Sequence, residues 1–173
     1  MQYLDSISLI GVKEINKRIE SFFQPSIQFY EYLTLKFPYR KSEGQTKYLH
    51  FDNDSLNIEL WADEYGYIFE VNLLNFKSII KIESIGTINY TKGIPYFDYG
   101  QLKNENRIIN FESSNVEILT TPNDLVFKFC EGNLDENSWI GYDKMYYGIN
   151  SMDILSSIIY LDYGYGDILT YGK

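Results

Sequence analysis

The chain contains one histidine and one cysteine, and these two residues limit the nucleophilic chemistry open to it. His50 lies in "KYLHFDND", where Leu49 and Phe51 share one face of an alternating pattern and His50 lies on the other. A catalytic triad or dyad would need His50 as the base and Cys130 or a serine as the nucleophile. Neither kind of nucleophile stands in a signature such as G-x-S-x-G. The position of His50 beside Asp52 favours a structural or solvated role.

Metal and nucleotide sites find little support in the same inventory. A zinc site built from Cys and His alone needs four such ligands, and this chain has two. "DNDSLNIE" begins like a calcium loop at Asp52 and Asp54, but Leu56 stands where the third ligand belongs and Asn57 where the glycine belongs. No G-x-G-x-x-G or Walker A pattern occurs. We therefore expect no metal and no cofactor.

Carboxylate pairs remain as candidates for glycoside hydrolysis. Examples are Asp63 with Glu64 and Asp162 with Asp167. Any acidic domain supplies such pairs, so only their geometry would decide a catalytic role. Because the other reaction classes lack their residues, the sequence favours a protein that is not an enzyme.

Tyrosine–glycine steps are the most distinctive pattern of the chain. Six of the twelve glycines directly follow a tyrosine, and four of these steps have an aspartate within two residues. In the structural interpretation, tyrosine ends a strand and glycine turns the chain. In the functional interpretation, the turns present tyrosine and carboxylate together to a partner. The partner-binding residues would then be Asp63, Glu64, Tyr65, Asp98, Tyr99, Asp143, Tyr146, Tyr147, Asp162, Tyr163, Tyr165 and Asp167.

The net charge of −9 indicates the kind of partner. Residues 1–50 carry +2, residues 51–130 carry −6 and residues 131–173 carry −5. An acidic chain without a basic stripe repels phosphate backbones, so we expect no direct contact with nucleic acid. The same field attracts a basic protein and speeds its association.

Length and hydropathy predict one soluble domain over residues 1–173. No apolar run reaches the 18 or so residues of a transmembrane helix, and "MQYLDSISLIGVKEINK" lacks the basic start of a signal peptide. A single cysteine precludes an intrachain disulfide. Together these features predict a cytoplasmic protein that does not enter a membrane.

The sequence pattern predicts the elements that position these residues, and together they make an α+β fold that is predominantly antiparallel β-sheet. Apolar residues at steps of three and four predict an N-terminal helix over about 9–23, and Asn150 predicts the cap of a short C-terminal helix over about 151–161. Alternation predicts one long strand over 27–37 and a meander with turns at "DNDS" and "DEYG". Further strands are predicted over 79–85, 87–91, 107–111, 116–120 and 125–130, and another strand or hairpin over 138–149. We expect residues 160–173 to be ordered, with Ile168 and Leu169 facing the core.

The stretches "DEYGYIF", "GYDKMYYG" and "DYGYGD" give the chain an acidic, tyrosine-rich character. In this respect it resembles the immunity proteins of bacterial polymorphic and contact-dependent toxin systems, a class with many unrelated folds. The resemblance implies a non-enzymatic inhibitor that binds a basic partner protein, often a toxin nuclease domain, and blocks its active site or a nearby surface. The alternative is a carbohydrate-binding or glycan-processing domain that uses the same tyrosines and carboxylates. The sequence leaves the oligomeric state open.

Overall fold

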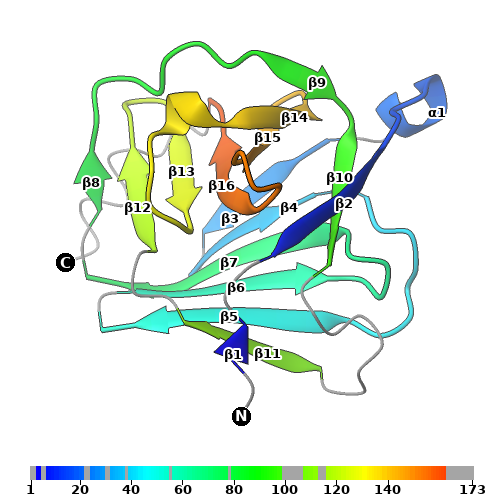
Figure 1. Ribbon diagram of the computed structural model, residues 1–173, viewed down its shortest axis with the longest axis horizontal. Helices are drawn as coiled ribbons and strands as arrows, with labels where there is room; N and C mark the ends of the chain where they lie inside the picture. Colours follow the sequence, from blue (N-terminus) through cyan, green and yellow to red (C-terminus); the bar gives the residue numbers. More distant parts are fainter. Residues whose placement is uncertain are drawn as a thin grey trace.

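Two seven-stranded β-sheets pack face to face, and a two-stranded sheet lies against one end of them (Figure 1). This computed structural model describes residues 3–4, 7–21, 24–29, 32–37, 39–54, 56–77, 79–98, 107–112 and 116–162. Within these ranges the helical segments are α1 (Lys17–Glu20) and the 3₁₀ turn η1 (Leu134–Glu136). Neither segment is long enough to cross a membrane.

The first sheet is built around the predicted meander. Its spatial order is β1 (Tyr3–Leu4), β11 (Ile108–Glu112), β5 (Lys47–Asn53), β6 (Leu56–Ala62), β7 (Ile68–Phe76), β4 (Leu33–Lys36) and β3 (Ser26–Phe29). The "DNDS" and "DEYG" turns join β5 to β6 and β6 to β7, as predicted. β11 is parallel to both β1 and β5, whereas the other pairs in this sheet are antiparallel.

The second sheet is formed mainly by the C-terminal part of the described chain. Its spatial order is β8 (Ile80–Lys81), β12 (Glu117–Thr120), β13 (Leu125–Lys128), β16 (Leu155–Tyr160), β15 (Met145–Ile149), β14 (Ser138–Tyr142) and β9 (Tyr90–Lys92). The two edge strands, β8 and β9, pair in parallel with their neighbours. The remaining small sheet pairs β2 (Ser8–Lys13) with β10 (Ile94–Asp98).

The main core lies between the inner faces of the two large sheets. In β5 and β6, buried residues alternate with partly exposed ones, which is the pattern of strands with one face in a core. Leu49, Leu60 and Val71 of the first sheet belong to the same buried cluster as Phe127 and Ile158 of the second. Burial of this apolar surface is the main stabilising contribution.

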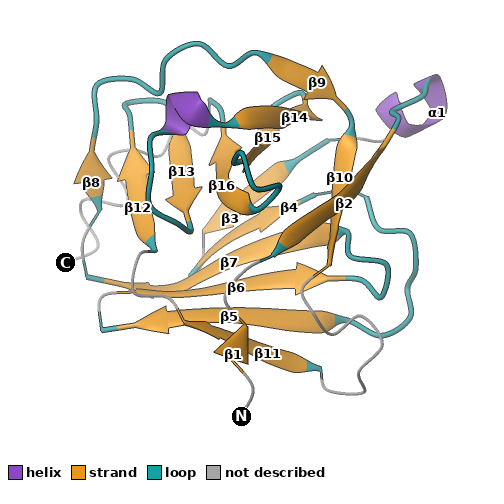
Figure 2. Ribbon diagram, viewed as in Figure 1, coloured by secondary structure: helices purple, strands orange, loops and turns teal. Residues whose placement is uncertain are grey.

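The second sheet is buried on its outer face as well. Val126, Trp139 and Ile159 point away from the main core and form their own cluster. The connection from β8 to β9, which Figure 2 shows as a long loop, contributes Ile82 and Ile85 to this cluster, and η1 contributes Leu134. The outer face of the first sheet, in contrast, carries the polar and aromatic side chains described below.

The fold class predicted from the sequence was wrong, because the N-terminal helix over 9–23 is absent. Residues 8–13 form strand β2, and in the described part of 9–23 the helical structure is limited to α1. Pairing with β10 places the hydroxyl of Tyr96 directly over Gly11, where a side chain would clash. Among the described residues of this segment, Ile19 is buried in a small cluster with Tyr67 and Ile94, and Ile15 packs partly buried against it. Tertiary strand pairing has overridden a short helical pattern.

The predicted C-terminal helix over 151–161 was also wrong. Residues 155–160 form β16, which pairs with β13 on one side and β15 on the other. All six of its residues are buried, because both faces of this sheet are covered. Asn150 caps a turn: its Oδ1 accepts from the backbone N of Met152 at 2.9 Å and of Ile154 at 3.1 Å. A short apolar run bounded by turn residues fits a buried strand as well as a helix.

Most of the other predicted strands are present, although several are shorter. The strand expected over 27–37 is instead the hairpin of β3 and β4, with Ser26 opposite Lys36. The hairpin over 138–149 is confirmed as β14 and β15. β10 was not predicted. The expectations for Ile168 and Leu169 concern residues outside the described ranges.

Candidate functional site

Asp63 is a structural residue in the turn that begins the "DEYG" stretch. Its side chain is fully buried, and its Oδ2 accepts from the backbone N of Lys41 at 2.7 Å and of Ser42 at 3.3 Å. Its Oδ1 accepts from the backbone N of Tyr65 at 2.9 Å and of Tyr67 at 3.1 Å. A carboxylate that accepts four backbone N–H groups holds the loop before β5 against the β6–β7 turn. It therefore offers no free contact surface to a partner.

Glu64 and Tyr65 are exposed at the tip of the same turn. Ser42 Oγ donates to Glu64 Oε1 at 2.6 Å, and the ammonium of Lys41 lies 4.1 Å from the centre of the Tyr65 ring. The exposed Asp98 ends β10 nearby, since the backbone N of Phe97 donates to the carbonyl oxygen of Gly66. The fold thus brings these three predicted contact residues to one end of the sandwich.

The predicted contact residues of the second sheet divide into buried tyrosines and exposed aspartates. Tyr146 and Tyr147 are both 5% exposed, so they contribute packing and not contact surface. Asp143 and Asp162 are exposed, both with left-handed backbone angles. Their turns meet, because the backbone N of Leu161 donates to the carbonyl oxygen of Lys144 at 2.8 Å. Tyr99, Tyr163, Tyr165 and Asp167 lie outside the described residues.

Burial raises the pKa of several of these hydroxyls. The pKa of Tyr146 rises to about 12, chiefly through burial and then through the neighbouring Tyr90, while its hydroxyl donates to the carbonyl oxygen of Asp143 at 2.6 Å. Burial also raises the pKa of Tyr147, whose hydroxyl donates to the carbonyl oxygen of Ile68. The pKa of Tyr67 rises to about 12, mainly because it is buried. These phenols remain protonated at physiological pH.

Residues 116–162, which form five of the seven strands of the second sheet and the loops between them, carry a net negative charge. Residues 116–162 contain eight Asp and Glu and two Lys, a net charge of −6 out of −9 for the whole chain. Six of the eight carboxylates are exposed: Glu131, Asp135, Glu136, Asp143, Asp153 and Asp162. Of the two lysines, Lys128 pairs with Glu117 at 3.2 Å. We call this part of the molecule, residues 116–162, the acidic half.

A partly open cavity of about 300 Å³ lies within the acidic half. Two carboxylates, Glu131 and Glu136, contribute to its wall, and Asn150 and Ser151 line it from the turn before β16. Cys130 also lines it, and burial raises the pKa of this thiol, which keeps it in the less reactive protonated form. With the charge of Lys128 compensated by Glu117, the carboxylates of this wall favour a positively charged group.

The outer face of the first sheet carries a row of aromatic rings that the sequence reasoning missed. Tyr48 and Trp61 are directly opposite each other on β5 and β6, with ring centres 5.3 Å apart and planes at 89°. Phe69 of β7 follows at 6.5 Å from Trp61, and the guanidinium of Arg40 lies 4.3 Å above the Phe69 ring. The alternation of residues 57–61 contained the signal, since Trp61 falls on the face opposite Leu60.

A hydrogen-bonded polar row runs beside the aromatic row. Glu59 accepts from the indole N of Trp61 with one oxygen and contacts Nε2 of His50 with the other. Across β7 and β4, Thr34 Oγ1 donates to Asn72 Oδ1 at 2.7 Å. His50 is thereby tied to Glu59 on the first sheet, whereas Cys130 lies two residues beyond β13 of the second. In the described part of the chain, no three His, Cys, Asp or Glu side chains converge to hold a metal ion.

No protein-family model matches this chain, and no curated protein matches it.

Proposed function

We propose that this protein is a non-enzymatic inhibitor of the immunity type, which binds a basic partner protein through the acidic half. The observation that supports this function best is the concentration of charge. Six exposed carboxylates and a net charge of −6 lie within 47 consecutive residues that form five of the seven strands of the second sheet. A field of one sign over one face steers an oppositely charged protein toward it.

The arrangement of reactive side chains supports binding over catalysis. His50 lies on β5 of the first sheet and Cys130 follows β13 of the second, and the raised pKa of the Cys130 thiol lowers the fraction of thiolate. Asp63 and Glu64, one of the candidate carboxylate pairs, are engaged with the backbone and with Ser42. The toxin nuclease domain implied by the resemblance is one basic partner that would suit this surface.

The test is affinity capture with two variants of equal charge change. Glu131→Gln, Asp135→Asn and Glu136→Gln together reduce the charge of the acidic half, while Glu43→Gln, Asp52→Asn and Asp54→Asn reduce that of the first sheet. We expect the wild-type chain and the second variant to retain a basic protein, identified by mass spectrometry, and the first variant to bind it at least tenfold more weakly. Equal loss in both variants, or retention of acidic proteins only, would contradict the proposal.

Saccharide binding on the outer face of the first sheet is a second candidate, favoured by the aromatic row. Aromatic rings beside fixed carboxylate and amide groups can pack on the apolar face of a sugar ring and bind its hydroxyls, and Tyr48, Trp61 and Glu59 provide such a combination. Retention on a glycan array that is lost in Tyr48→Ala would support it. Absence of retention for the wild-type chain would remove it.

A further inference from the structure

Strand β2 leaves an open edge next to the acidic half. On one side it pairs with β10 along its length. On the other side only its first residues are bonded, since the backbone N of Leu9 donates to the carbonyl oxygen of Asp153 at 2.7 Å. No strand among the described residues covers positions 10–13 on that side. The edge of a strand presents backbone donors and acceptors that can pair with another chain.

Apolar side chains flank this open edge. Ile10 is 50% exposed, Val12 is 39% exposed, and Met152, which directly precedes Asp153, is 71% exposed. Native edge strands are commonly protected by charged side chains or proline, and here the only charged residue of the strand is Lys13 at its end. An exposed apolar patch beside an open edge is typical of an interaction surface.

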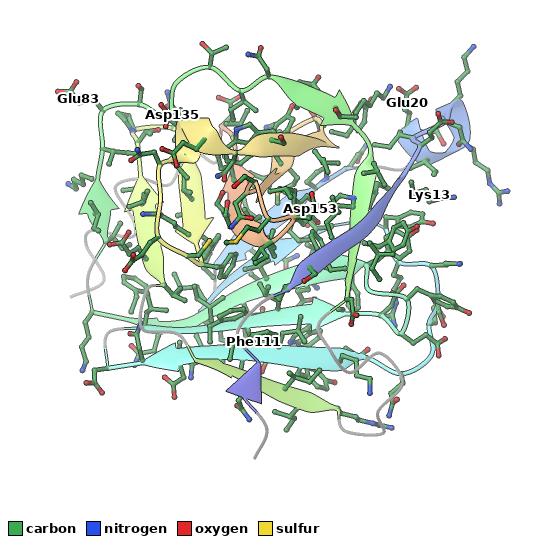
Figure 3. All side chains as sticks on the ribbon, in the orientation of Figure 1. Lys13, Glu20, Glu83, Phe111, Asp135 and Asp153 are labelled. Carbon is green, nitrogen blue, oxygen red and sulfur yellow. The ribbon has the colours of Figure 1, made fainter. Side chains whose placement is uncertain are left out.

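The charges beside the edge indicate which partner it fits. Figure 3 shows Asp153 next to β2 on the side turned to the viewer, with Lys13 at the far end of the strand. Asn150 and Ser151, in the same turn as Asp153, also line the cavity that contains Glu131. The open edge, the apolar patch and the acid-lined cavity therefore adjoin one another along residues 150–153.

We propose that an extended basic segment of the partner adds as a strand to the open edge of β2. Its apolar side chains would pack on Ile10, Val12 and Met152, and a lysine or arginine would extend toward Asp153 and the cavity. Strand addition gains affinity from main-chain hydrogen bonds and specificity from alternating side chains. This surface provides an open edge for the hydrogen bonds, and an apolar patch and an acidic cavity for the side chains. The inference rests on the proposed function and states where on the acidic half the partner binds.

The probe is a fluorescently labelled eight-residue peptide of alternating arginine and valine, titrated into the full chain by anisotropy. We expect saturable binding that weakens at least tenfold when the arginines are replaced by glutamate. The same loss is expected when the backbone nitrogens along one edge of the peptide are methylated, because that edge can no longer donate. Ile10→Lys should weaken binding at least tenfold, and so should Met152→Lys, whose exposed position preserves the fold. Ile108→Lys is the matched control on β11, where the isoleucine is 58% exposed, and should change nothing.

Several results would overturn the edge site. They are no binding of the arginine–valine peptide, equal binding of its methylated form, or equal binding by the Ile10→Lys and Met152→Lys variants. The proposed function fails separately. A captured basic protein that binds wild type and Ile10→Lys alike, but not the variant of residues 131, 135 and 136, would exclude the edge and leave the function standing. If the peptide binds the edge but no basic protein partner is captured, the edge site stands and the proposed function is excluded.

Discussion

Asp63 and Tyr67 are hydrogen-bonded to each other in both directions. The backbone N of Asp63 donates to the carbonyl oxygen of Tyr67 at 3.0 Å, and the backbone N of Tyr67 donates to Oδ1 of Asp63 at 3.1 Å. The same carboxylate also accepts from the backbone of Lys41 and Ser42. One aspartate thus closes the β6–β7 turn and fastens a loop about twenty residues earlier in the chain, which explains why it is buried.

Asp63→Ala should be strongly destabilising. The substitution leaves backbone donors without their acceptor in a buried turn, and a hydrogen bond to a charged group contributes about 1.5–3 kcal/mol. We expect the free energy of unfolding to fall by roughly 3 kcal/mol or more, measured by urea denaturation. Glu64→Ala, at the exposed tip of the same turn, is the control and should change it by about 0.5 kcal/mol or less. Similar small losses in both variants would show that Asp63 does not organise the turn.

Two glycines with positive φ, Gly66 and Gly86, allow the cost of left-handed backbone strain to be measured apart from the cost of a steric clash. Gly66 has φ of +90°, and a Cβ there would overlap the carbonyl oxygen of Phe97. Gly86 has φ of +76° and open space around the same position. Gly86→Ala should therefore cost only the left-handed strain of about 1–2 kcal/mol, whereas Gly66→Ala should cost clearly more. Thermal melts of the two variants measure the difference, and equal melting temperatures would contradict the contact between the β6–β7 turn and β10.

Stability should decrease at alkaline pH because of the buried tyrosines. Tyr67 and Tyr146 have pKa values of about 12 in the folded protein, against an ordinary value of 10.0. Between these values the unfolded chain loses the phenolic protons and the folded chain keeps them, so rising pH favours unfolding. The stabilisation is complete below pH 10 and is lost toward pH 12, on the order of 2 kcal/mol for each tyrosine.

Urea denaturation between pH 9 and pH 11.5 measures this decrease. Burial lowers the pKa of Lys47 from 10.5, which acts in the opposite direction because the unfolded chain then binds the extra proton. That contribution ends at the ordinary lysine value, so the decline should be steepest above about pH 10.5. Tyr146→Phe removes one of the phenols and should make the decline of the free energy of unfolding with pH less steep. A free energy of unfolding that stays constant over this range would contradict the burial of these hydroxyls.

Features that depend on local chemistry could be predicted from the sequence. The turns after β5 and after β6 follow from residues that bond their own backbone, as Asn53 does when its Oδ1 accepts from the backbone N of Leu56. The half-buried face of β5 followed from alternation, and His50 lies on that face. These are properties of a few neighbouring residues.

Features that depend on distant partners could not be predicted. β2 and β16 were expected to be helices, and their strand conformation is set by β10, β13 and β15. Tyr146 and Tyr147 were expected at a surface, but the β8–β9 connection covers the outer face of their sheet while the core covers the inner face. The aromatic row of Tyr48, Trp61 and Phe69 forms only when three strands align in register. The local sequence pattern places each of these rings on a strand face, but it does not show that the three strands bring them together.

Hydrogen–deuterium exchange of the chain, alone and with the captured basic partner, tests the central claim most directly. We predict slower exchange in residues 8–13, 131–137 and 150–153, together with an association rate that falls steeply between low and physiological ionic strength. Slower exchange confined to β5, β6 and β7, with an association rate that is independent of salt, would contradict binding through the acidic half.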